Sequence, residues 1–66
     1  MDGKIGTIPV EQDEEYDVEI SFMGEKKDGI AKIEGYTIFV PNTQVGDKVR
    51  IKIVRVLPQY AFAEVV

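Results

Sequence analysis

The stretch that decides the fold is Lys48-Val-Arg-Ile-Lys-Ile-Val-Arg-Val56. From Lys48 to Ile53, charged and β-branched apolar residues alternate strictly, which predicts a strand with one buried face and one charged face. The alternation then shifts by one residue at the adjacent apolar pair Ile53 and Val54, before Arg55 resumes it. A shift that leaves both halves amphipathic predicts a β-bulge, as in a strand that bends around a barrel.

Shorter segments of the same kind lie on both sides of this strand. We expect strands over 16–22, 29–33, 36–40 and 60–66, because each is rich in β-branched and aromatic residues and is bounded by glycine, proline or polar residues. The glycine-containing pair at 34–35 predicts a tight turn, and no window has helical periodicity. In a chain of 66 residues these elements predict an all-β fold, a small five-stranded antiparallel barrel of OB-like or SH3-like type, since closure leaves few exposed edges.

Charge is distributed unevenly along the chain. Residues 1–20 carry seven acids and one lysine, a net charge of −6, whereas residues 21–66 carry seven bases and five acids, a net charge of +2. We expect residues 1–13 to be an acidic, partly flexible segment, in which Ile8 or Val10 can dock beside the first strand, and residues 14–66 to form the barrel. The acidic stretch either keeps the protein soluble or shields a basic face, and the sequence leaves both open.

Several functions are excluded by residues that the chain lacks. It has no cysteine and no histidine, which excludes disulfides, thiolate or imidazole metal sites, and catalysis by either side chain. No phosphate-binding loop, dinucleotide fingerprint or nucleophile motif occurs, so we expect no enzyme activity, no cofactor and no metal site. No apolar run reaches the length of a secretory signal or of a membrane span, so we expect a cytoplasmic protein without membrane contact.

Side-chain alternation assigns residues to the two faces of each strand. If Ile38 and Val40 point inward, Phe39 points outward; if the small residues Ala61 and Ala63 point inward, Tyr60 and Phe62 point outward. The same argument places basic side chains on the outer surface, and two more lie in a glycine-flanked loop. The candidate nucleic-acid-binding residues are Lys26, Lys27, Lys32, Phe39, Arg50, Lys52, Arg55, Tyr60 and Phe62.

This mixture of rings and cations suits single-stranded nucleic acid, because bases stack on aromatic rings and phosphates need neighbouring cations. Two other interpretations stay open. A register error of one residue would bury the rings in the core, and alternating bases on an outer face are often only solvated. Phe22 is the reverse case: it continues the phase of Val18 and Ile20, which favours a place in the core.

Four segments together resemble a known family. They are Asp28-Gly-Ile-Ala-Lys-Ile, Gly35-Tyr-Thr-Ile-Phe-Val-Pro41, Val45-Gly-Asp-Lys-Val49 and Tyr60-Ala-Phe-Ala-Glu-Val65. In this order they resemble a TRAM domain, and the chain from about Pro9 is similar to the stand-alone TRAM proteins of archaea. In larger proteins the domain is joined to tRNA-modifying enzymes, methyltransferases and methylthiotransferases, where it is taken to bind RNA. The resemblance implies an RNA-binding protein that acts, like bacterial cold-shock proteins, as an RNA chaperone.

The leading hypothesis is therefore a monomeric, sequence-tolerant RNA chaperone. It stacks unpaired bases on surface aromatics and holds phosphates with lysine and arginine, and its partner is single-stranded or weakly structured RNA, tRNA included. The alternative hypothesis is a protein-interaction barrel that docks a ribosomal or RNA-modification partner, with the acidic segment supplying charge complementarity.

Overall fold

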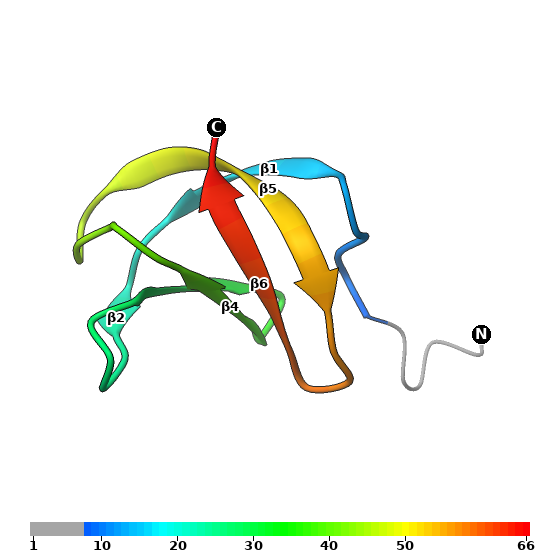
Figure 1. Cartoon of the computed structure of the whole chain (residues 1–66), viewed down its shortest axis with the longest axis horizontal. Helices are drawn as coiled ribbons and strands as arrows, with labels where there is room; N and C mark the ends of the chain where they lie inside the picture. The colour runs from blue at the N-terminus through cyan, green and yellow to red at the C-terminus, as the bar shows by residue number, and fades with distance from the viewer. Residues whose placement is uncertain (1–7) are drawn as a thin grey trace.

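A single curled sheet forms the protein, and the structure, a computed structural model, describes residues 8–66 (Figure 1). The strand order is β1-β5-β6-β4-β3-β2. The strands are β1 (Glu15–Glu19), β2 (Phe22–Met23), β3 (Gly29–Ile33), β4 (Tyr36–Val40), β5 (Lys48–Val56) and β6 (Tyr60–Val65). Residues 8–66 contain no helix, and so none that could cross a membrane. The predicted small all-β barrel fold is confirmed, and the observed sheet is a strongly curled half-barrel of six strands where five were predicted.

The two edges of the sheet come from one continuous stretch of chain. β1 pairs with β5 and β2 pairs with β3, both antiparallel. Between them the pairing partner changes from one residue to the next: Ile20 N donates to Asp47 O at 2.8 Å, and Ser21 N donates to Ile30 O at 2.9 Å. The first expected strand is thus divided into β1 and β2, and this stretch closes the curled sheet from both sides.

Phe22 does not lie in the core, so the prediction that it does is wrong. Its side chain is 57% exposed, whereas that of Ile20 is 1% exposed. The reason is the change of pairing partner at Ile20 and Ser21, which interrupts the alternation that begins at Tyr16. Beyond that point the phase is set by β3, in which Ile30 lies opposite Phe22.

The remaining strands agree closely with the alternation patterns. The shift at Ile53 and Val54 is a β-bulge, because the register of β5 against β6 jumps between Ile53 and Arg55. The turn between β3 and β4 places Glu34 and Gly35 at φ of 51° and 82°, as a two-residue hairpin turn requires. β4 and β6 pair in parallel, the one parallel pair in the described sheet, because the chain returns from β4 through the long strand β5.

The core is filled by the inward faces that the alternation predicts. Its buried residues are Val10, Ile20, Ala31, Ile38, Val40, Ile51, Ile53, Ala61 and Ala63. Val10 comes from the predicted acidic segment 1–13 and is only 3% exposed, although it belongs to no strand. Residues 1–7 of that segment lie outside the described residues, and the division at residue 13 stays a prediction.

Tyr36 fixes the turn between β5 and β6. Its half-buried hydroxyl donates to the carbonyl oxygens of Leu57 and Tyr60, the latter at 2.7 Å, so the two acceptors share one proton. We expect Tyr36→Phe to lower the free energy of unfolding by about 1–2 kcal/mol, the loss typical of a hydrogen bond whose acceptors stay partly buried. Urea denaturation followed by circular dichroism measures this. An unchanged denaturation midpoint would show that the hydroxyl does not stabilise the turn.

Candidate nucleic-acid interface

Three aromatic rings form a cluster on the outer face of β4 and β6. The ring centroids of Phe39, Tyr60 and Phe62 lie 5.5 to 5.7 Å apart in all three pairs. Phe39 and Phe62 are tilted by 31°, and Tyr60 meets both nearly edge-on. Because Thr37 and Phe39 lie opposite Tyr60 and Phe62 in the parallel pairing, the pleat brings the rings to the same face.

The rings lie at the surface. Tyr60 is 37% exposed and Phe62 is 40% exposed, while Ala61 between them is fully buried. Phe39 is half-buried between Ile38 and Val40, both fully buried. The alternative that these rings lie in the core is therefore wrong, and the predicted register is confirmed for β4 and β6. Tyr60 and Phe62 thus present exposed ring surface on which a flat group can stack.

A groove lies beside the cluster. It has a volume of about 430 Å³ and is lined by the three rings together with the loop between β2 and β3, through Gly24, Glu25, Lys26 and Asp28. The loop is held by backbone bonds, in which Gly24 N donates to Asp28 O at 2.8 Å and Lys27 N donates to Gly24 O at 3.0 Å. Lys26 thus lies on the groove, whereas Lys27 is exposed in the same loop and does not line it.

Two further predicted cations lie next to the rings in the sheet. Arg55 lies directly opposite Phe62, because the bulge in β5 advances the register by one residue and puts Arg55 where Val54 would otherwise lie. Lys32 lies opposite Thr37, which in turn lies opposite Tyr60. The interface thus has cations on the loop side and on both flanking strands.

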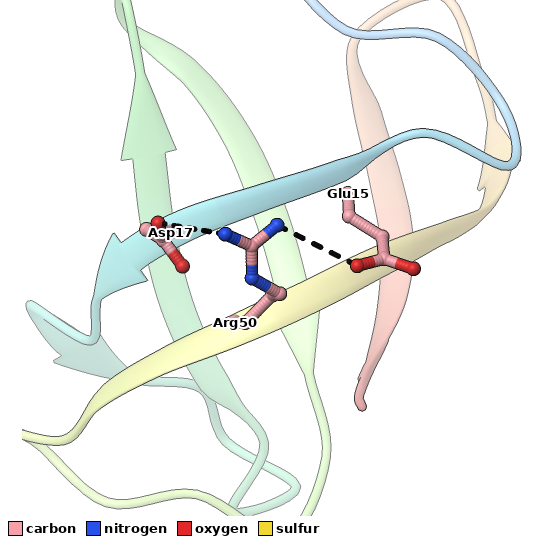
Figure 2. A network of polar contacts seen from close by, with 3 residues as sticks. All are labelled: Glu15, Asp17 and Arg50. Carbon is pink, nitrogen blue, oxygen red and sulfur yellow. Dashed lines mark hydrogen bonds and ion pairs between the residues drawn. The ribbon is translucent and has the colours of Figure 1, made fainter.

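Arg50 and Lys52 lie elsewhere, in a ladder of opposite charges between β1 and β5. Arg50 Nη1 lies 3.5 Å from Glu15 Oε1, and Arg50 Nη2 lies 3.3 Å from Asp17 Oδ2 (Figure 2). The register places Lys52 opposite Glu15, with Glu64 on its other side. Glu15 and Asp17 belong to the acidic stretch of residues 1–20, so the structure supports the interpretation that this stretch covers a basic face. Eight of the nine candidate residues thus form two groups, and Lys27 belongs to neither.

Sequence reasoning missed the carboxylates of the groove and the exposure of Phe22. Glu25 and Asp28 flank the two lysines of the loop, but a loop has no periodicity that assigns its side chains to a surface. The ion pair of Arg50 with Asp17 on β1 could not be predicted either, because the two residues lie 33 positions apart in the sequence.

Comparison with known proteins assigns the family. The TRAM domain model matches residues 9–66. The "Uncharacterized protein MJ0660" of Methanocaldococcus jannaschii is 49% identical over 57 residues, which is 86% of this chain and 74% of that protein. The "Ribosomal RNA large subunit methyltransferase E" of Methanosarcina barkeri is 44% identical over 62 residues, 94% of this chain but only 24% of the methyltransferase.

A solved structure agrees with both. The solution structure of the conserved protein from the gene locus MMP0076 of Methanococcus maripaludis has a TM-score of 0.86 and is 45% identical, covering 91% of this chain and 86% of that one. The fold is a small, strongly curled all-β half-barrel. The chain belongs to the TRAM domain family, and this domain is an RNA-binding module.

Proposed function

We propose that the protein binds single-stranded RNA on the aromatic cluster of Phe39, Tyr60 and Phe62 and acts as a sequence-tolerant RNA chaperone. The observation that carries this proposal is the contact of three rings on one face of the sheet, two of them exposed and Phe39 half-buried. Stacking of a base on an aromatic ring contributes about 1–3 kcal/mol and tolerates any base, because every base has a π-face. Two or three stacked bases supply a useful affinity without base-specific hydrogen bonds.

Phosphates are held by the cations that border the cluster. Lys26 lines the groove, Arg55 flanks Phe62, and Lys32 lies one step beyond Thr37. With about three phosphate contacts, the logarithm of the binding constant should fall against the logarithm of the salt concentration with a slope of about −2. This modest electrostatic contribution is consistent with a net charge of −4 on the whole chain.

Chaperone activity follows if the protein binds unpaired RNA in preference to paired RNA. A protein that binds only unpaired segments shifts the pairing equilibrium toward them by the free energy of that binding, without ATP. Each 1.4 kcal/mol of differential binding changes the ratio of open to paired RNA by about tenfold. Weak contacts spread over a few rings and cations also permit rapid release, which lets the RNA pair again.

The test is an NMR titration of isotope-labelled protein with an unstructured oligouridylate and, separately, with a perfect RNA duplex. We expect shifts of the amides of β4, β6 and the loop at 24–28 with the single strand, and much weaker binding of the duplex. Shifts confined to β1, or equal affinity for both RNAs, would contradict the proposal. A protein-docking barrel, the alternative function, would give no shifts with either RNA.

The charge ladder predicts that the acidic strand weakens RNA binding. In the double variant Glu15→Gln/Asp17→Asn, the guanidinium of Arg50 loses both partners, and we expect RNA affinity at low salt to rise by up to about fivefold for each pair removed. Fluorescence anisotropy measures the affinity. Glu11→Gln/Glu34→Gln removes the same charge away from Arg50, and an equal rise in this control would show that only net charge matters.

A further inference from the structure

Outward side chains from five strands form one row across the sheet. Direct register partners connect Phe22 on β2 to Ile30 on β3, Ile30 to Phe39 on β4, Phe39 to Phe62 on β6, and Phe62 to Arg55 on β5. Residues directly opposite each other on neighbouring strands point to the same face. The row therefore crosses the sheet at right angles to the strands, with an aromatic ring at one end and a guanidinium at the other.

Ile30, which is partly buried, joins Phe22 to the aromatic cluster along this row. A methyl group placed on Gly24 would lie 3.6 Å from Ile30 Cδ1 and 3.9 Å from Phe39 Cε1, so Gly24 lies against both side chains and, having no side chain of its own, covers little of them. Phe22, beyond Ile30, is 57% exposed. Exposed apolar side chains that adjoin one another typically mark an interaction surface, and Phe22 adjoins the aromatic cluster through Ile30.

We propose that Phe22 is a further stacking residue, and that single-stranded RNA crosses the strands along this row from Phe22 to Arg55. The inference rests on the proposed function. It adds the path of the RNA over the sheet, the length of the bound segment and Phe22 as a contact. RNA fits better than an apolar partner because cations accompany the rings, with Lys26 on the groove in the middle and Arg55 at the end. Single-stranded RNA, with a flat base and one negatively charged phosphate in each nucleotide, matches this combination of rings and cations.

The length of the row sets the length of the RNA segment. Four steps between neighbouring strands span about 19 Å, at roughly 4.8 Å a step. A nucleotide advances about 3.4 Å when stacked as in a duplex, and an unstacked strand extends roughly twice as far. The row accordingly holds about four nucleotides, of which one stacks on Phe22 and one or two stack on Phe39 and Phe62.

The first experiment measures affinity against length, using oligouridylates of two to eight nucleotides. For the wild type we expect affinity to rise steeply with length up to about four nucleotides and only slowly thereafter. Phe22→Ala should weaken binding of the longer oligonucleotides by about five- to hundredfold and leave the dinucleotide unchanged. Val45→Ala is the matched control, since Val45 is equally exposed at 57% but lies in the loop between β4 and β5.

The second experiment reads stacking directly. The chain has no tryptophan, so Phe22→Trp introduces a single indole whose fluorescence a stacked base should quench, whereas Val45→Trp should not respond. If the wild type binds RNA but Phe22→Ala binds every length equally well and the indole at 22 is not quenched, the inference is wrong and the proposed function stands. If the wild type binds no oligonucleotide, the proposed function fails and the inference fails with it.

Discussion

The double variant Phe39→Ala/Phe62→Ala is expected to lose at least about thirtyfold in affinity for unstructured RNA. Each ring offers a stacking surface worth about 1–3 kcal/mol per base, so removing both costs about 2 kcal/mol or more. Each single variant should lose less than half of this binding free energy, because it leaves two of the three mutually contacting rings in place. Fluorescence anisotropy at low, fixed salt is the measurement.

Two controls separate binding from folding in this experiment. Aromatic pairs also stabilise the fold by about 0.5–1.5 kcal/mol each, so thermal denaturation is measured on the same samples. Phe39→Leu/Phe62→Leu keeps apolar side chains but removes the π-faces, and it should fold yet still bind poorly. Val45→Ala/Val66→Ala removes two equally exposed apolar side chains outside the cluster and should bind normally. Normal RNA binding by a folded Leu variant would contradict base stacking on these rings.

The parts of the fold that alternation predicts are those governed by neighbouring residues. β3, β4, β5 and β6 occur where the patterns place them, and the bulge follows from the adjacent pair Ile53 and Val54. The outward rings are also predictable, because Ala61 and Ala63 are small enough for the crowded interior and thereby fix the phase of Tyr60 and Phe62. Period-two patterning thus identifies the aromatic half of the candidate site.

The parts that alternation does not predict depend on which strands lie side by side. Phe22 is exposed because the chain changes pairing partner at Ser21, and nothing in the local pattern reports a change of partner. Arg50 lies outward, as its strand predicts, but its engagement with Asp17 depends on the register between β1 and β5. Register between distant strands is determined by turn geometry and by burial of the whole sheet, so one-strand reasoning cannot assign it.

Gly29→Ala is expected to be the most destabilising single substitution of the set, at about 3 kcal/mol. A Cβ at this position would lie 1.9 Å from Thr43 Oγ1 and 3.0 Å from Ile20 Cγ2. Thr43 cannot move away cheaply, since it is 4% exposed and its hydroxyl donates to Val40 O at 2.7 Å. Overpacking costs about 1–3 kcal/mol and a disrupted buried hydrogen bond costs a similar amount.

In a domain of this size such a loss lowers the melting temperature by about 12–24 °C, which thermal denaturation followed by circular dichroism measures directly. Gly24→Ala is the matched control, because its added methyl group would meet its neighbours at 3.6 Å or more, an ordinary contact distance.

The cause of the destabilisation is tested by the double variant Gly29→Ala/Thr43→Ala, which removes the clashing oxygen. If the clash with Oγ1 dominates, this double variant is more stable than Gly29→Ala alone, although Thr43→Ala by itself destabilises the protein. Additive losses would instead show that the clash with Ile20 dominates. A wild-type melting temperature for Gly29→Ala would contradict the prediction and show that the loop from Pro41 to Asp47 moves without cost.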